Sequence, residues 1–366
     1  MTTVQVSTHR LEAASLDLEY PTASLYSGLL WNRAFASIDG TSHLHVAEQV
    51  GEGVGWLATH LLVDRTPNPV YDSSSIAGLT ARIEPDSWYP QLLLGARNGQ
   101  YNPANVPEVG APDVLSALVG SAELVGSASL AWLYADSDSA QKLLDLKMGF
   151  VPYLSDVDSS IRVAKGGLDE FIASLPSNRR SVVRRDVKRA GGLPAVRVMR
   201  SDEGDLLTKY AELAVQTQTR HGQSPSVAGM TTYLEKCVAA GHPAVVFFYG
   251  PLEKPTAFSL AIAAYGTLWM RLVGLNYDDN GNTEGQYPGV LAIGPAVYAA
   301  EHGLGSVNVG AGTSDFKRYR GAKATPRWSL LRPPPGTHID LDAVWRRNLD
   351  EAERLHVDAE SLLRMG

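Results

Sequence analysis

The amino-acid sequence predicts an α/β protein with two domains. Its 366 residues are about two to three times the length of a typical domain, which is enough for two separate cores. Hydrophobic residues make up 44% of the chain and charged residues 19%, so wholesale disorder and collagen-like repetition are excluded. Apolar strand-like segments alternate with amphipathic helical segments, which is the pattern of an α/β fold.

Elements of the first half follow from short apolar runs bounded by turn residues. Residues 24–35 predict a short helix, and a long loop that contains Gly and Pro spans 96–112. Further strands are predicted at 43–48, 55–63, 91–95, 129–134 and 149–154, and further helices at 114–123 and 137–146.

The second half begins at a flexible Lys-Gly-Gly junction, 165–167. Helices are predicted at 168–175, 181–190, 202–219, 230–240 and 289–302, and strands at 195–199, 244–249, 256–265, 268–275, 306–309 and 327–331. Short turns join the three successive strands between 244 and 275 into an antiparallel meander. A run of three prolines ends this half, and a charged helix, 340–363, closes the chain. We therefore expect domains at 1–164 and 165–335 and a helical tail at 336–366.

Cysteine content and hydropathy bear on the compartment. The single cysteine, Cys237, excludes an internal disulfide and a thiolate metal cluster, which fits a reducing compartment. No apolar run approaches the roughly 18 residues of a membrane span, and residues 1–12 lack the pattern of a secretory leader. We expect a cytoplasmic protein without a membrane partner.

Charge is distributed unevenly along a chain whose net charge is −7. Residues 176–200 hold eight basic residues and one acid, a net charge of +7, and residues 316–332 hold six basic residues and no acid. Within the predicted helix 181–190 and the residue before it, Arg180, Arg184 and Lys188 recur every fourth residue opposite an apolar stripe. Two basic segments in an acidic chain favour a polyanionic partner held at a defined place, with phosphates as the anion. The alternative is that each segment is a solvated surface.

Four segments resemble the FemAB-like branch of the GNAT acyltransferase superfamily: 175–192, 217–222, 267–304 and 309–321. Their order and spacing, rather than any single motif, carry the resemblance, which covers about 165–335. The resemblance implies two GNAT-like domains, each a mixed, mostly antiparallel sheet flanked by helices, with the first domain a degenerate copy of the second.

The resemblance implies transfer of an activated acyl group to an amine. The donor in the FemAB-like branch is often an aminoacyl-tRNA, and in other GNAT enzymes it is acyl-CoA, held on a Gly-rich turn that opens a helix. Here that turn, 286–292, has one Gly at the turn and a Pro that removes an N–H donor. An aminoacyl-tRNA donor, with no tightly bound cofactor, is therefore favoured.

The resemblance also implies roles for individual residues. Phe316-Lys317 matches a Phe-Lys pair beside the reacting ester, so that Lys317 would neutralise the developing oxyanion or the 3′ leaving group. The following residues are expected to bind the phosphates of the tRNA: Arg180, Arg184, Arg185, Lys188, Arg318, Arg320 and Lys323. A lysine beside a core aromatic is the structural alternative.

Aminolysis of an activated ester needs positioning, charge stabilisation and a modest base. Asp315 and Tyr287 rank first as the base, ahead of His221 and Asp278, although each of the four also suits a structural role as a cap or in packing. His221, which precedes a Gly after a helical run, fits a helix C-cap.

Candidate acceptor residues lie in the long loop of the first half: Arg97, Tyr101 and Asn102. No metal site is expected, because His43, His45 and His60 have no carboxylate partner at metal spacing. They are interpreted as structural.

Three functions stay open. The first is an aminoacyl-tRNA-dependent aminoacyltransferase that forms an amide on a small amine, a natural-product intermediate or a cell-wall precursor. The absence of a long heptad arm favours the small-molecule acceptor. The second is an acyl-CoA-dependent N-acyltransferase of the same fold, and the third is a binding protein for a polyanion. No DNA partner is expected.

Overall fold

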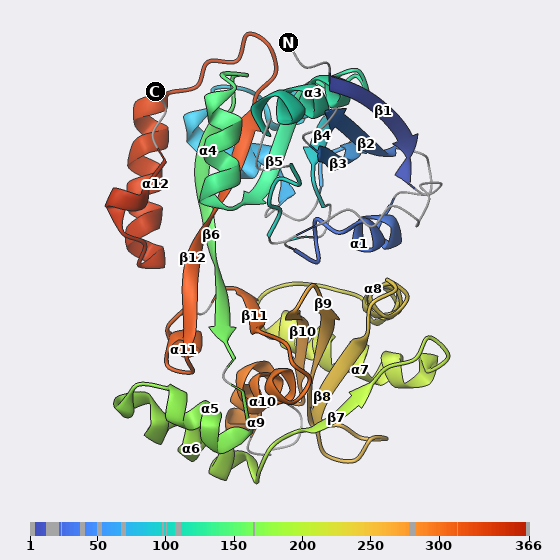
Figure 1. Cartoon of the computed structure of the whole chain (residues 1–366), viewed down its shortest axis with the longest axis vertical. Coiled ribbons are helices and arrows are strands. Elements are labelled where there is room, and N and C mark those ends of the chain that lie inside the picture. The colour runs from blue at the N-terminus through green and yellow to red at the C-terminus, as the bar shows by residue number, and fades with distance from the viewer. Residues whose placement is uncertain are drawn as a thin grey trace. The chain divides into compact units, whose positions relative to one another are not determined.

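The computed structural model places the chain in two compact units, residues 1–157 with 325–366 and residues 158–324 (Figure 1). It describes residues 4–11, 22, 24–36, 41–49, 53–66, 71–96, 99, 101–106, 111–163, 165–277, 283–312 and 314–363. Among these residues, no helix is both long enough and apolar enough to cross a bilayer. We call the two parts unit 1 and unit 2 and describe each by itself.

Unit 1 is built on a sheet in which most neighbouring strands are antiparallel. Its strands are β1 (Val4–Arg10), β2 (Ser42–Gln49), β3 (Gly53–Leu62), β4 (Gln91–Leu94), β5 (Ser129–Ala135) and parts of β6 (Val151–Arg162) and β12 (Ala322–Arg332). Neighbours β4 and β5 are parallel, whereas β1–β2, β2–β3, β3–β4 and β5–β12 are antiparallel. Its helices are α1 (Leu29–Ala34), α2 (Ser73–Ala77), α3 (Ala111–Glu123), α4 (Ser137–Asp145) and α12 (Leu341–Leu355), with 3-10 turns at Gly78–Thr80, Pro85–Trp88 and Ala359–Ser361.

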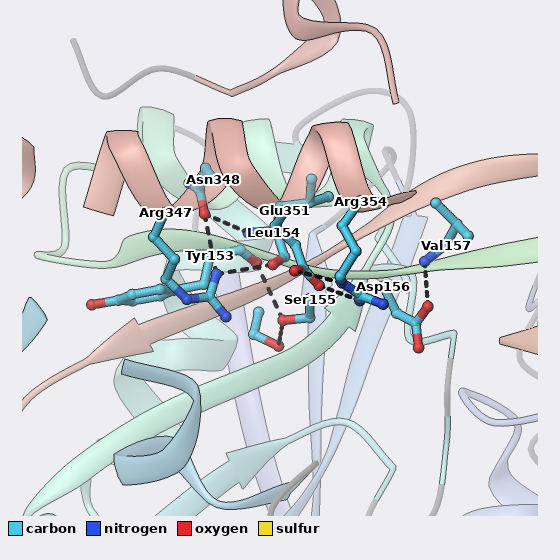
Figure 2. A network of polar contacts seen from close by, with 10 residues as sticks. Tyr153, Leu154, Ser155, Asp156, Val157, Arg347, Asn348, Glu351 and Arg354 are labelled. Atoms are coloured by element: carbon cyan, nitrogen blue, oxygen red, sulfur yellow. Dashed lines mark hydrogen bonds and ion pairs between the residues drawn. The ribbon is translucent and has the colours of Figure 1, made fainter. Parts of the chain in front are cut away.

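Helix α12 belongs to the core of unit 1. Leu355 and Ala352 are buried in the cluster that also holds Trp132 of β5 and Leu118 of α3. Polar groups fasten this helix to β6: Asn348 accepts from the N–H of Leu154 at 2.9 Å (Figure 2). The same side chain donates to the carbonyl of Pro152 at 2.9 Å. The closing segment is thus packed into unit 1 and is not a separate tail.

Unit 2 has a sheet in which β11 (Ser306–Ala311) lies between β6 and β10 (Thr267–Leu275), with the order continuing to β9, β8 and β7. The remaining strands are β7 (Ala195–Val198), β8 (Ala244–Tyr249) and β9 (Ala257–Ala264), and the helices are α5 (Leu168–Ser174), α6 (Ser177–Ala190), α7 (Gly204–Arg220), α8 (Val227–Val238), α9 (Thr283–Pro288), α10 (Gly294–Glu301) and α11 (Ser314–Arg318). A π-helical segment, Gly289–Ile293, joins α9 to α10. Among the paired strands that the structure describes in unit 2, only β10 and β11 are parallel, and the other pairs are antiparallel.

The core of unit 2 lies between the sheet and the helices that follow the junction. Phe171 of α5, Val183 of α6 and Val290 of the π-helical segment are buried together with Val245 of β8 and Ala261 of β9. These apolar positions leave the opposite side of α6 to its charged residues, because a helix buries one stripe.

The predicted α/β class is confirmed, and the predicted strands and helices correspond to observed ones. Three differences concern the presence or the bounds of an element. Strand β1, which the sequence did not predict, is an edge strand whose side chains are mostly exposed, so it lacks an apolar pattern. The helix expected from Gly289 begins at Thr283, and the helix expected at 24–35 is only Leu29–Ala34, preceded by a turn.

The compact units also differ from the sequence-based ranges. They divide the chain at 157/158 and at 324/325, whereas the sequence suggested 164/165 and a tail after 335. The reason is that β6 and β12 each continue through a boundary without a break, and that the second part of β12 pairs with β5 from Trp328 to Arg332.

Candidate active site

Lys317 lies in the short helix α11, which follows strand β11 in the chain. Its side chain is buried, with the whole residue 3% exposed. The Nζ atom donates to the carbonyl of Gly310 at 2.8 Å and also to the carbonyl of Ala311. Burying an ammonium group is costly unless acceptors surround it, and these carbonyls supply them. Lys317 is therefore held at a fixed place relative to the strand.

Phe316 lies between a cation and a second aromatic ring. The guanidinium carbon of Arg320 lies 3.7 Å from the centroid of the Phe316 ring. The ring of Tyr287, from α9, has its centroid 4.7 Å from that of Phe316, at an interplanar angle of 42°. Both arrangements are favourable contacts for an aromatic side chain, so the part of α11 around Phe316, which we call the Phe316 turn, is packed against α9.

Arg320 connects this turn to helix α6. Its Nη2 atom pairs with Oδ2 of Asp186 at 2.6 Å, and its Nη1 atom donates to the carbonyl of Phe316 at 2.8 Å. The two side chains of the ion pair are 9% and 7% exposed. Burial lowers the pKa of Arg320, and the Asp186 carboxylate opposes that change. Asp186 was not among the residues selected from the sequence, because its partner is 134 residues away.

The position of Arg320 differs from its expected role. The sequence predicts phosphate binding for it, but a guanidinium that is buried and paired with Asp186 is not presented to solvent. Its observed place makes it a connection between α6 and the Phe316 turn.

Helix α6 presents three of its expected basic residues to solvent: Arg184, Arg185 and Lys188 are exposed, while Val183 and Asp186 are buried. These three lie on the side of the helix opposite the buried stripe, in agreement with a helical period of 3.6 residues. The ion pair of Asp186 fastens the same helix to the Phe316 turn, so the exposed cations and Lys317 belong to one assembly.

Arg180 is turned back toward helix α5. Its Nε atom donates to the carbonyl of Leu175 at 2.8 Å and its Nη2 atom to the carbonyl of Ala173 at 2.9 Å. These carbonyls lie at the end of α5, where backbone acceptors have no helical partner. Arg180 therefore closes that helix, in contrast to the outward position predicted from its spacing.

The other charged candidates near α11 are at the surface. Asp315 pairs with Arg318 at 2.9 Å, and both side chains are more than half exposed. Lys323, at the start of β12, is exposed. Of the two residues ranked first as a base, Tyr287 contacts the Phe316 ring, whereas the Asp315 carboxylate is engaged by a neighbouring surface residue.

The residues expected to bind the acceptor have different surroundings in unit 1. Asn102 is 1% exposed; it donates to the carbonyl of Leu133 at 2.9 Å and accepts from the N–H of Ala96 at 3.2 Å. This buried amide holds its own loop in place. Tyr101 is partly buried with the guanidinium of Arg327 4.0 Å from its ring centroid. Arg97 lies outside the described residues.

Two of the three histidines of unit 1 that the sequence interprets as structural, His45 and His60, are held by hydroxyl groups. The ring of His45 is within 2.9 Å of Ser121 Oγ and 3.1 Å of Thr59 Oγ1, and His60 is 2.8 Å from Ser42 Oγ. Burial, with a smaller contribution from His43, lowers the pKa of His45 to about 4. Within the described ranges, no cluster of three or more His, Cys, Asp or Glu side chains could hold a metal ion.

His221 and Asp278 are the two lower-ranked candidates for the base. His221 is the C-cap of α7, as its place before Gly222 predicted. The carbonyl of Gln218 accepts from its backbone N–H at 3.0 Å. Asp278 lies outside the described residues.

The segment that corresponds to a CoA-binding turn lies inside a helical run. The backbone is right-handed helical at Pro288, at Ile293 and at Gly294, and the N–H of Gly294 donates to the carbonyl of Gly289. A phosphate cradle needs N–H groups that are free at a helix N-terminus. The helical run begins instead at Thr283, so the N–H groups of 289–294 are not at its start.

Comparisons with known proteins support the fold. No protein-family model and no curated protein matches the chain. The chain is similar to the crystal structure of FemX, with 13% sequence identity and a TM-score of 0.56 over 90% of this chain and 95% of that one. It is also similar to the C-terminal domain of a protein assigned as a lysylphosphatidylglycerol synthetase from Agrobacterium fabrum, with 13% identity and a TM-score of 0.50 over 89% and 91% of the two chains. The chain therefore has a fold like that of FemX, in agreement with the fold predicted from the sequence.

Proposed function

We propose that this chain is an aminoacyltransferase that takes its aminoacyl group from an aminoacyl-tRNA and forms an amide on an amine acceptor. The observation that carries the proposal is the buried Arg320–Asp186 ion pair. It joins α6, whose exposed face is cationic, to the segment that contains the buried Lys317. A long polyanionic donor with a reactive ester at its end fits such an arrangement.

The helix face supplies the binding energy for the donor. Arg184, Arg185 and Lys188 are exposed on α6 and have no role in the core of unit 2. Exposed Arg and Lys residues bind phosphates and release counterions, so the affinity falls steeply as salt rises. Arg318 and Lys323 extend the cationic surface beyond Lys317.

Lys317 supplies charge stabilisation. The acceptor nitrogen attacks the ester carbonyl, which forms a tetrahedral intermediate with a negative oxygen. The bond between the carbonyl carbon and the ribose oxygen then breaks and the amide forms. The amine loses one proton and the leaving ribose oxygen gains one, so the protons balance. A fixed ammonium group near these oxygens lowers the barrier because its charge is already in place. Tyr287, against Phe316, is the candidate to pass the proton.

Two further observations support aminoacyl transfer over acyl-CoA chemistry. The segment expected to cradle a CoA pyrophosphate lies within a helix, as described above. The name of one structurally similar protein, lysylphosphatidylglycerol synthetase, denotes a product that carries an aminoacyl group. The small-molecule amine remains the preferred acceptor, with a cell-wall precursor as the other class.

Discharge of a pool of charged tRNAs tests the proposal. The purified full-length chain is incubated with tRNAs that carry labelled amino acids and with a panel of amines, and free amide is measured. We expect one or a few amino acids to be discharged in an amine-dependent way. Amide formed from acetyl-CoA, with no tRNA discharged, would overturn the proposal in favour of the acyl-CoA reading.

A further inference from the structure

We propose that Asn308 and Asp158 are positioning residues for Lys317, an inference that rests on the function proposed for that lysine. Asp158 lies on β6, Asn308 lies on β11, and all of the residues concerned belong to unit 2. Neither residue is close to Lys317 in the sequence, and neither was selected from it.

The three side chains are linked through the backbone of one residue, Gly310. Asn308 Nδ2 donates to Oδ2 of Asp158 at 2.6 Å, and Asn308 Oδ1 accepts from the N–H of Gly310 at 3.0 Å. The carbonyl of the same Gly310 accepts from Lys317 Nζ at 2.8 Å. Asp158, Asn308 and Lys317 are respectively 3%, 4% and 3% exposed, so water does not replace these bonds at low cost.

The backbone between Asn308 and Lys317 departs from a regular strand. In the pairing of β11 with β6, Asn308 lies opposite Ser160 and Gly310 lies opposite Ser159, so that β11 has one extra residue there. Gly310 has φ 69°, in the left-handed region that favours glycine. This is a β-bulge, a device that redirects neighbouring backbone groups.

Asn308 lies at the position where the pairing of β11 with β10 ends, while its pairing with β6 continues. The parallel pairing of β11 with β10 consists of three positions and ends at Asn308 and Trp269. The next residues of β11 are the bulge. An asparagine suits this position because its amide can donate to Asp158 and accept from Gly310 at once, which neither Asp nor Leu can do.

The consequence concerns the direction of the Gly310 carbonyl. The Asn308 side chain holds the N–H of Gly310, and the carbonyls of Gly310 and Ala311 hold the Lys317 ammonium. Fixing the N–H of Gly310 restrains the backbone angles of that residue, and hence the direction of its carbonyl. Loss of the Asn308 amide leaves the bulge without its support, so the ammonium group is no longer held at one place. A residue that acts in this way changes kcat more than KM for the donor, because it touches only the reacting end.

Labelling of lysine amines measures this positioning without a substrate. The full-length chain and its Asn308→Ala variant are treated with an amine-reactive reagent over a series of pH values, and the labelling of Lys317 is compared by mass spectrometry with that of the exposed Lys165 in the same sample. We expect the ratio of the two rates to rise about tenfold in Asn308→Ala, as loss of hydrogen bonds predicts. Asp158→Ala, which keeps the bond to Gly310, raises the ratio less.

Asn348→Ala is the matched control. Asn348 is a buried asparagine that likewise bonds the backbone of β6, but in unit 1. We expect it to lower stability without changing the labelling of Lys317. If Asn308→Ala does not fold, Asp158→Ala carries the test.

The outcomes separate the two proposals. An unchanged ratio in a folded Asn308→Ala or Asp158→Ala chain overturns the positioning role, whatever the enzyme does. A raised ratio with no tRNA-dependent activity in the wild-type chain keeps the positioning role and overturns the proposed function. A raised ratio together with a loss of kcat at nearly constant KM supports both.

Discussion

The two basic segments of the chain are alike in composition and different in structure. In 176–200, Arg184, Arg185 and Lys188 are exposed on one side of α6. In 316–332, Lys317, Arg320 and Arg327 are 3%, 8% and 6% exposed. The first segment thus presents cations to solvent, whereas three cations of the second are fixed inside the protein. The hydrogen-bond and ion-pair partners of each basic residue, rather than the charge density of its segment, decide whether its side chain is exposed to solvent.

The largest expected effect comes from breaking the connection between the segments. Asp186→Ala leaves the Arg320 guanidinium buried without its carboxylate, which costs about 3–5 kcal/mol of unfolding free energy. The double variant Asp186→Leu with Arg320→Met should recover most of that loss, because it removes both charges. Urea denaturation measures both, and an Asp186→Ala chain as stable as wild type would show that the pair is not buried in solution.

Replacement of the buried lysine tests the fixed cation. Lys317→Met should lower kcat for aminoacyl transfer by about 10²–10³-fold with little change in KM for the tRNA, as loss of one preorganised charge predicts. Lys165→Met, at an exposed position of the same unit, is the control and should leave kcat unchanged. Steady-state kinetics check it; an effect confined to KM would place Lys317 in binding and not in the chemical step.

A buried imidazole sharpens the contrast with the buried cations. His45 has hydroxyl neighbours and no carboxylate in its recorded hydrogen bonds, and burial lowers its pKa to about 4. In the unfolded chain it takes up a proton near its ordinary value of 6.5, so its contribution to stability is present above that pH and is lost as the pH falls toward 4.

The slope of this loss is about 1.4 kcal/mol per pH unit at most. His45→Gln should flatten that part of the stability curve, as followed by urea denaturation at several pH values. An equal slope in both chains would mean that His45 is charged in the folded protein.

The exposed face of α6 should give the smallest effects per residue. Arg184→Glu should weaken the binding of charged tRNA about tenfold and reduce its salt dependence, since each phosphate contact contributes to the salt slope. Arg346→Glu, an equal charge change at an exposed position of α12, is the matched control. Filter binding over a salt series distinguishes them, and equal losses in the two variants would mean that only net charge matters.

Much of the fold could be predicted from the sequence because it depends on local pattern. The stripe of Val183 and Val187 and the apolar runs of β8 to β10 predict their elements directly. The candidate site was harder to predict from the sequence. Asp186 is one acid among eight bases, and only the tertiary fold shows that Arg320 is its partner.

The spacing of residues in the sequence also does not show which groups a side chain will bond. Arg180 repeats in register with Arg184, yet it bonds the carbonyls of α5. Asn102 lies in a Gly- and Pro-containing loop of the kind that often binds ligands, yet its amide is used up in holding that loop. Asn308 shows no signal in the sequence, because its importance depends on the bulge that follows it.

The central claim is that a donor held on α6 delivers its reactive end to Lys317. A charged tRNA with a photoreactive group on its terminal adenosine tests this directly, with cross-linked peptides identified by mass spectrometry. The account predicts cross-links within 314–323, competed by unmodified charged tRNA. Specific cross-links only to peptides of unit 1 would contradict it.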